Sequence, residues 1–213
     1  MTINANNWTP VNHQPIVGGA NGAITSLGLG SSGNILASAG AGANPSFSDV
    51  TDSWVLLQTQ TPSNATYVEF TSKISSTYKT YAVTFNAFVC ANGSAPSLAM
   101  LISSDNGANY SVTNYLSGMW FMNYNNNTIN NYNGTSYFFL SAGNALPGGF
   151  GTMFLYNFGS SGYPQIQGKG YANGDWVWFS GINTSVATYN AIRFAYTSGN
   201  ITSGTISLYG IKQ

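Results

Sequence analysis

The chain has 213 residues, five basic and five acidic side chains, and a formal net charge of zero. Charged residues make up 5% of it, against roughly a quarter of an average soluble domain, whereas aromatic residues make up 15%. This composition excludes a mainly disordered chain, which would have few aromatic residues and a high net charge. The basic residues are scattered, so we expect no nucleic-acid partner, and no apolar run is long enough to predict membrane insertion.

Residues 1–50 are rich in Gly, Ala, Ser and Asn and contain two aromatic residues, Trp8 and Phe47. Their start lacks the basic and apolar regions of a secretory signal. Apolar residues stand singly or in pairs between Gly-rich spacers, so the segment cannot bury them alone. It is either a flexible linker or an extended attachment segment that contacts neighbouring copies or a docking protein. The residues expected in those virion-attachment and trimer contacts are Ile16, Val17, Ile24, Leu27, Leu29, Ile35, Leu36 and Phe47.

Residues 51–213 consist of runs of β-branched and aromatic residues separated by turn signals, a pattern that predicts strands. The expected strands are 54–58, 66–70, 80–89, 98–103, 110–116, 136–140, 152–158, 176–179, 191–196 and 205–209. Asn-Gly dipeptides at 92–93, 106–107, 133–134 and 173–174 suit tight turns with positive φ angles. The sequence therefore predicts an all-β head, an antiparallel jelly-roll-like β-sandwich, preceded by the extended N-terminal segment.

The most distinctive part of the head is residues 119–137, MWFMNYNNNTINNYNGTSY. Mixed Tyr and Asn are typical of adaptable recognition surfaces, where rigid rings stack and amides form hydrogen bonds. We expect Trp120 and Phe121 in the core and the following residues in an exposed loop that contacts a glycan or receptor. The ligand-contacting residues expected there are Tyr124, Asn126, Tyr132 and Asn133.

The inventory of catalytic side chains is small. His13 is the one histidine and lies in the polar N-terminal segment, so a Ser-His-Asp site has little support. Asp105 and Asp175 stand beside Asn-Gly dipeptides and fit turn positions better than a pair of glycosidase carboxylates. Cys90 follows Phe88 and Val89 and is expected to be buried in a strand. We therefore expect no catalytic residue, no metal site and no cofactor.

Two segments resemble parts of phage and viral fibre proteins. Residues 32–47 follow a Gly-x-x-Leu-x-Ser-x-Gly-x-Gly-x-x-Pro-x-Phe pattern that precedes the globular part of phage tail fibres and related virion proteins. Residues 198–212 resemble the last hairpin of a β-sandwich found in phage fibre and capsid-associated proteins. The residues that fit the first pattern are Gly33, Leu36, Ser38, Gly40, Gly42, Pro45 and Phe47.

This resemblance implies a homotrimer on the virion surface, attached to a capsid or tail protein by its N-terminal segment. The expected function is that of a non-enzymatic structural protein, a short fibre or spike whose head contacts a host-surface glycan or protein. The chain has almost no repetitive shaft, which leaves a capsid decoration protein open. A polysaccharide depolymerase and a carbohydrate-binding module are further alternatives.

Overall fold

The computed structural model describes residues 16–18, 24–26, 31, 34–38, 43, 45–49, 53–91, 96–123, 128–141, 149–172 and 175–212. Residues 16–18, 24–26, 49, 123, 128–130, 132 and 172 are described by their backbone alone. The chain divides into two compact units, residues 1–52 and residues 53–213. Each unit is described by itself below.

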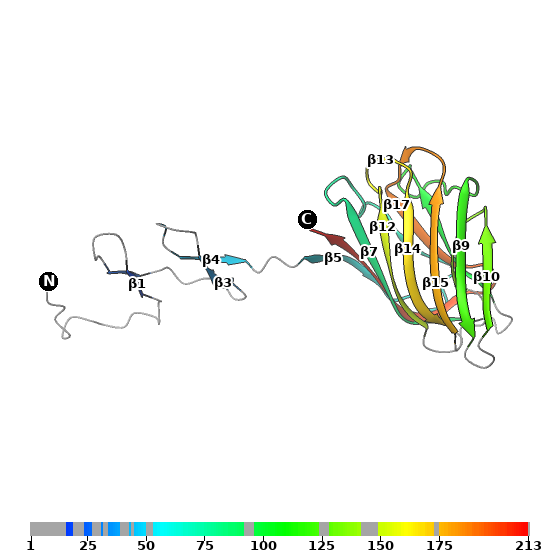
Figure 1. Ribbon diagram of the computed structural model, residues 1–213, viewed down its shortest axis with the longest axis horizontal. Coiled ribbons are helices and arrows are strands. Elements are labelled where there is room, and N and C mark those ends of the chain that lie inside the picture. Colours follow the sequence, from blue (N-terminus) through cyan, green and yellow to red (C-terminus); the bar gives the residue numbers. More distant parts are fainter. Residues whose placement is uncertain are drawn as a thin grey trace. The chain divides into compact units, whose positions relative to one another are not determined.

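The first unit contains two antiparallel hairpins rather than one continuous extended strand (Figure 1). Strand β1 (Ile16–Gly18) pairs with β2 (Ile24–Ser26), and β3 (Asn34–Ala37) pairs with β4 (Ser46–Asp49). In the second hairpin Leu36 lies opposite Phe47. Two-stranded hairpins of this length are marginally stable in water by themselves. Further contacts would therefore stabilise these hairpins.

The second unit is built on an eight-stranded antiparallel sheet, whose middle strands lie side by side in Figure 1. Its strand order is β10-β9-β15-β14-β12-β7-β18-β5. In that order the strands are β10 (Thr128–Gly134), β9 (Tyr115–Asn123), β15 (Asp175–Asn183), β14 (Gln165–Ala172), β12 (Gly149–Tyr156), β7 (Thr80–Cys90), β18 (Ile201–Ile211) and β5 (Trp54–Gln60).

A four-stranded antiparallel sheet faces the large one, with strand order β11-β8-β17-β6. Its strands are β11 (Phe138–Ser141), β8 (Leu98–Ser103), β17 (Ala191–Tyr196) and β6 (Val68–Phe70). The two-residue strands β13 (Ser161–Gly162) and β16 (Ala187–Thr188) form a further pair. No helix occurs among the described residues, and none of them therefore forms an apolar helix long enough to cross a bilayer. The expected all-β, antiparallel class is confirmed.

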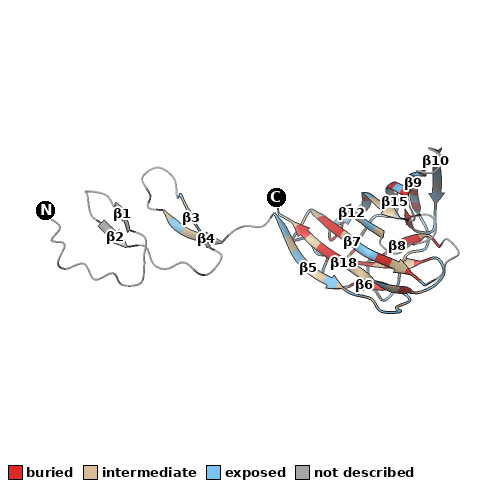
Figure 2. Cartoon of the chain, turned by 90° about the horizontal axis from the view of Figure 1, so that it is seen from below, coloured by how far each residue is buried: buried red, intermediate tan, exposed pale blue. Residues whose placement is uncertain are grey.

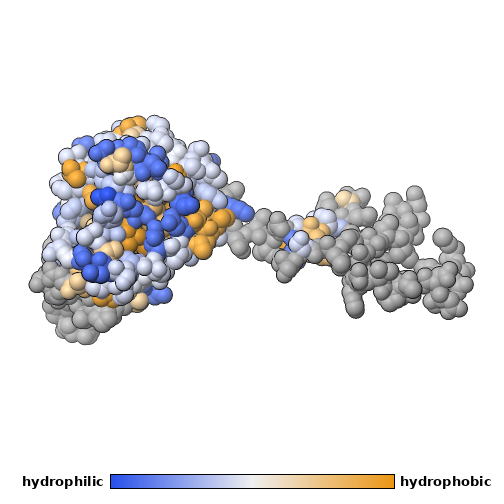
Figure 3. Space-filling view, turned by 180° about the vertical axis from the view of Figure 1, so that it is seen from behind, coloured by the Kyte–Doolittle hydropathy of each residue, from blue (hydrophilic) through white to orange (hydrophobic). Residues whose placement is uncertain are grey.

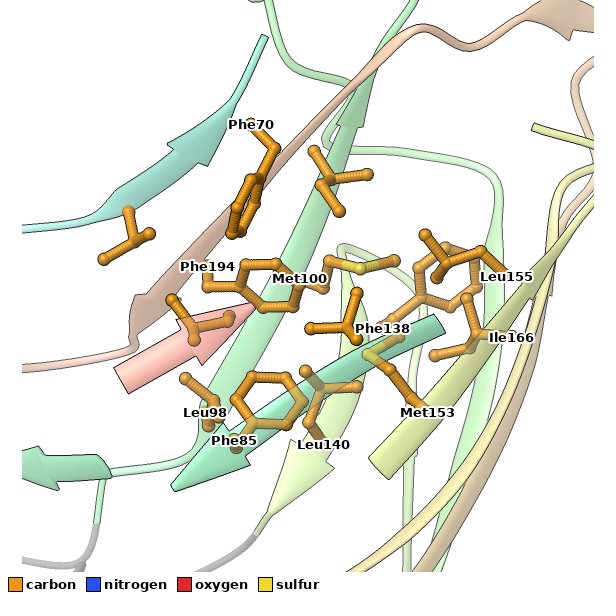
Figure 4. Close-up of a cluster of buried hydrophobic side chains, with 14 of the residues drawn as sticks. Phe70, Phe85, Leu98, Met100, Phe138, Leu140, Met153, Leu155, Ile166 and Phe194 are labelled. Carbon is orange, nitrogen blue, oxygen red and sulfur yellow. The ribbon is translucent and has the colours of Figure 1, made fainter. Parts of the chain in front are cut away.

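The hydrophobic core lies between the two sheets. Phe85 of β7 packs edge-on against Phe194 of β17, with ring centroids 5.3 Å apart, and Phe70 of β6 packs on the same Phe194 ring. Figure 4 shows these rings converging with side chains from β8, β11, β12 and β14. Burial of one such side chain contributes about 1.5–3 kcal/mol. Figure 2 shows buried residues along β7 and β18, whereas β5 at the sheet edge has none.

The structure agrees with many of the predicted strands and corrects others. Strands β8 and β17 coincide with the predicted 98–103 and 191–196, and Cys90 is buried at the end of β7 as expected. The predicted strand 110–116 is wrong, because β9 begins only at Tyr115. Asn106 and Gly107 do have positive φ angles of 58° and 92°. Strands β10 and β14 were not expected from the sequence.

Candidate binding face on the eight-stranded sheet

The eight-stranded sheet exposes one face to solvent, which we call the outer face. Along β15 burial alternates: Val177 and Phe179 are buried toward the core, and Trp176 and Trp178 between them are exposed. Side chains alternate between the two faces of a strand, and directly opposite residues of neighbouring strands point to the same face. The cross-strand register therefore shows which residues of the neighbouring strands point to the outer face. The outer face holds several large aromatic side chains together with hydroxyl and amide groups.

Three aromatic rings on adjacent strands form what we call the aromatic row: Phe150 of β12, Tyr171 of β14 and Trp176 of β15. Each ring lies directly opposite the next one across the sheet: Phe150 lies opposite Tyr171, and Tyr171 lies opposite Trp176. The Phe150 and Tyr171 rings stack with centroids 5.5 Å apart and an interplanar angle of 19°. Trp176 meets the Tyr171 ring edge-on at 5.7 Å. The contacts hold the rings in place while Phe150 and Trp176 stay exposed.

Two residues along the strand from Trp176, Trp178 lies opposite Trp120 of β9, and we call these two the tryptophan pair. Their exposed fractions are 47% and 65%. The expectation that Trp120 lies in the core is therefore wrong. Phe121, its neighbour in β9, does pack against the core. Contiguous exposed apolar patches are a feature of interaction surfaces.

A row of polar side chains crosses the sheet in register with the tryptophan pair, and we call it the polar track. One residue comes from each of the strands β14, β12, β7, β18 and β5, so the track spans four strand spacings, roughly 19 Å. The Thr59 and Ser207 hydroxyls at its far end are hydrogen-bonded at 2.8 Å. The members of the track are Lys169, Thr152, Thr84, Ser207 and Thr59.

A second group of rings, the edge cluster, borders the other side of the polar track. Trp54 of β5 contacts Phe154 of β12 and Tyr209 of β18, with ring centroids 5.8 Å and 5.6 Å away. Between the strands of these rings, β7 contributes Ala82 opposite both Phe154 and Tyr209. The small alanine side chain leaves room for the rings to meet above it. The polar track thus runs between two aromatic borders.

Described residues of the outer face line two hollows. The first, the aromatic hollow, has a volume of about 310 Å³ and the second, the amide hollow, about 410 Å³. Both fall within the range of small-ligand sites, roughly 300–1,000 Å³. The aromatic hollow is lined by Thr84, Phe85, Phe150, Gly151, Thr152, Lys169, Gly170 and Trp176. The amide hollow is lined by Leu116, Gly118, Tyr156, Gln165, Ile166, Gln167, Ser180, Gly181 and Ile182.

Glycine in β14 shapes the floor of the aromatic hollow. A Cβ atom on Gly170 would lie 2.6 Å from the Phe150 carbonyl oxygen of the neighbouring strand, so any larger residue would push the two strands apart. Gly170 also lines an apolar cavity of about 50 Å³, together with Phe85 and Leu140 of the core. It is too small for a sugar or peptide side chain. The open hollows of the outer face are therefore the better candidates for a ligand site.

Two of the four residues expected to contact a ligand lie in a strand beside this face rather than in a loop. Tyr132 and Asn133 belong to β10, the edge strand next to β9, where Asn133 is exposed opposite Gly118. Tyr132 is opposite Met119 by its backbone register. Tyr124 and Asn126 lie outside the described residues. The Tyr- and Asn-rich stretch is thus largely a β9–β10 hairpin, and its described part adds Asn131, an exposed amide opposite Trp120.

The residues expected to attach the chain are distributed over the two N-terminal hairpins. Ile35 and Leu36 of β3 are about half exposed, and Phe47 of β4 is half-buried. Ile16 and Val17 lie in β1 and Ile24 lies in β2, by their backbone positions. Leu27 and Leu29 lie outside the described residues. The exposed side chains of β3 are therefore available to a partner.

Two acidic residues of the head, Glu69 and Asp105, interact with neighbouring side chains of the fold. Glu69 forms an ion pair with Arg193, whose Nε donates to Glu69 Oε1 at 2.5 Å. The Arg193 guanidinium also lies between the Tyr67 and Tyr110 rings, 4.2 Å and 4.0 Å from their centroids. Hydrogen bonds from the Ser103 hydroxyl and from Asn109 lower the pKa of Asp105 to about 2.

The outer face combines exposed rings, which stack on flat apolar surfaces, with hydroxyl, amide and ammonium groups, which form hydrogen bonds. Within the described part of the chain no group of three or more His, Cys, Asp or Glu residues could hold a metal ion. Comparison with known proteins found no matching family model, no matching curated protein and no matching solved structure.

Proposed function

We propose that this chain is a structural protein of a virus particle, a short fibre that binds a glycan on the host surface through the outer face of its head. One observation carries the binding role: the polar track lies between the aromatic row and the edge cluster. A sugar ring has apolar C–H faces and a rim of hydroxyl groups, so it needs both aromatic rings and polar groups from its site. Ligand sites with aromatic walls and a few placed polar groups follow this pattern.

The length of the polar track favours an oligosaccharide over a single sugar. Five successive strands contribute to it, and the amide hollow continues the polar surface with Gln165, Gln167 and Ser180. An exposed patch built only to associate with protein would have an apolar centre and a polar rim. Here the polar side chains run through the middle of the patch and the rings border them.

The remaining parts of the proposal concern attachment and assembly. The first unit would attach to a capsid or tail protein, and three copies of the chain would form a homotrimer. Attachment through the first unit is supported by the exposure of Ile35 and Leu36 on a hairpin that is too short to be stable alone. Figure 3 shows hydrophobic residues scattered among hydrophilic and intermediate ones on the face of the head seen from behind. The formal net charge of the chain is zero, so electrostatic repulsion between copies would be weak. We assign the two facing sheets of the head to a jelly-roll-like sandwich.

Glycan binding is tested with the full-length chain on an array of bacterial and animal glycans. The variant Trp176→Ala/Trp178→Ala should lose binding at least tenfold. Val112→Ala/Val186→Ala is the matched control, because both valines are exposed outside the strands of the sheet. If the wild-type chain binds no glycan, or if the tryptophan variant binds as well as the control, the binding role is wrong.

The virion role is tested by electron cryo-microscopy of the source particle. Density that fits this chain in a few tens of copies at the tail or vertices would support the fibre, whereas hundreds of copies on the capsid would indicate decoration. Deleting residues 1–50 should abolish incorporation and leave the far-ultraviolet circular dichroism of the head unchanged. Incorporation that survives the deletion would refute attachment through the first unit, and release of reducing sugar from host polysaccharide would indicate a depolymerase.

A further inference from the structure

One charged side chain stands among the described outward-facing strand positions of the eight-stranded sheet. It is Lys169 of β14, which lies opposite Trp178 of β15 on one side and Thr152 of β12 on the other. It is exposed and contributes to the lining of the aromatic hollow. An ammonium group therefore stands at one end of the polar track, between the tryptophan pair and the threonines.

This ammonium has no carboxylate partner in the described part of the chain. The ion pair recorded there joins Arg193 to Glu69 on the four-stranded sheet. Arg193 is thus already neutralised and enclosed by two tyrosine rings, whereas Lys169 lies in an open hollow lined by neutral groups. The hollow presents one unit of positive charge that no described acidic side chain compensates.

The groups around Lys169 suit a carboxylate. The hydroxyls of Thr84 and Thr152 line the same hollow and can donate hydrogen bonds to a second oxygen atom. A single ammonium matches the single negative charge of a carboxylate. Among the described residues, no second basic side chain lines the hollow to neutralise a doubly charged phosphate. Charge-assisted hydrogen bonds are shorter and stronger than neutral ones.

We infer that the glycan bound by the outer face contains an acidic sugar, whose carboxylate pairs with the Lys169 ammonium in the aromatic hollow. The sugar ring would lie against Trp176 and Phe150, and neighbouring sugars would continue along the polar track. This inference rests on the proposed function and narrows its ligand class to uronic or sialic acid polymers. The two sources share the carboxylate and differ in the ring that bears it.

The test uses the full-length chain and two probes, a polyuronic acid and a polysialic acid, each in its native form and after chemical reduction of its carboxyl groups to alcohols. The wild-type chain should bind one native polymer about tenfold more tightly than its reduced form, an effect of the size expected for a partly exposed charge pair. Raising the salt concentration should weaken binding of the native polymer more than that of the reduced one.

Charge variants of the lysine separate this inference from the general binding role. Lys169→Gln keeps a hydrogen-bond donor without the charge. Its affinities for the native polymer and for the reduced polymer should lie within about twofold of each other. Lys169→Arg should keep the preference for the acidic form. Lys73→Gln is the control, because Lys73 is also exposed but lies between β6 and β7.

The outcomes distinguish the two proposals. Equal binding of native and reduced polymers, with both lost in Trp176→Ala/Trp178→Ala, overturns the acidic ligand and supports the glycan site. A Lys169→Gln variant that keeps the full preference also overturns it. If the wild-type chain binds neither these polymers nor any glycan of the array, the proposed function fails and the inference fails with it.

Discussion

Trp178 of β15 lies directly opposite Trp120 of β9, and both indole side chains face solvent although their strands occupy the interior of the large sheet. The residue after Trp178 is Phe179, which is 6% exposed and belongs to the core. Large apolar residues therefore occupy both faces of the same strand. Only one of the two faces contributes to the hydrophobic core.

This difference predicts that two neighbouring substitutions will affect stability to very different extents. Trp178→Ala should change the free energy of unfolding by less than about 0.5 kcal/mol, as surface substitutions usually do. Phe179→Ala should lower it by about 3–5 kcal/mol, because it removes a buried ring and leaves a cavity. Urea unfolding followed by circular dichroism measures both. A large loss in Trp178→Ala would mean that the indole is covered in solution.

The Arg193 cluster on the four-stranded sheet should be energetically coupled. The guanidinium pairs with Glu69 and lies between the Tyr67 and Tyr110 rings. Both charged side chains are about a quarter exposed, so we expect Arg193→Ala to cost about 1–2 kcal/mol. A double-mutant cycle with Glu69→Ala should give a coupling energy of about 0.5–1 kcal/mol. Additive effects would show that the ion pair contributes nothing to stability.

Alkaline pH should destabilise the head through its buried tyrosines. Burial raises the pKa of Tyr115 to about 12, and burial likewise raises the pKa values of Tyr110 and Tyr196. A phenol whose pKa is raised on folding stabilises the protein fully below the unfolded pKa, about 10. That contribution is lost as the pH rises from there through the folded value. The urea midpoint should be constant near neutral pH and fall above pH ~10.

Tyr115 supplies the control for this pH dependence. Its hydroxyl donates to the Ser111 carbonyl oxygen at 2.9 Å and accepts from the Ile102 amide at 3.2 Å. Tyr115→Phe should be less stable at neutral pH because the Ile102 amide loses a partner, and its alkaline decline should be shallower. An alkaline decline equal to that of the wild type would assign the effect to other groups.

The close approach of β12 and β14 predicts that Gly170→Ala will disturb both stability and binding. The added methyl group would lie 2.6 Å from the Phe150 carbonyl oxygen, and such overpacking typically costs about 1–3 kcal/mol. Because the aromatic row spans the same strands, glycan affinity should fall as well. The measurements are urea unfolding and glycan binding of the folded variant. Unchanged values of both would mean that the strands separate at no cost.

The sequence predicts the core strands better than the composition of the outer face, and β14 shows why. Its inward positions include Gly168 and Gly170, so the usual apolar signal of a strand is missing. At Gly168 a Cβ atom would lie 2.4 Å from the Phe179 ring, which fills the space that a side chain would otherwise take. Phe179 lies on the next strand, β15, so the pattern within β14 alone does not reveal how this position is filled.

The tryptophans illustrate the same limit for the site. The run Trp176 to Phe179 is apolar at every position, so alternation cannot tell which face is buried. The sequence therefore suggested recognition by the Tyr- and Asn-rich stretch and placed Trp120 in the core. The position of the four-stranded sheet determines which face of β15 is buried, because this sheet covers one face of the large sheet and leaves the other open. By contrast, the alternating run in β7 predicted its strand with nearly correct bounds.

The position of β18 determines when the head can fold during synthesis. This late strand pairs on one side with β7 and on the other with β5, and it brings Ser207 to Thr59 across 148 residues of sequence. Until residues 201–211 have left the ribosome, β5 and β7 both present unpaired edges, which favour aggregation. Assembly of the large sheet therefore follows translation of the head, and chains that end before β18 should require chaperones or be degraded.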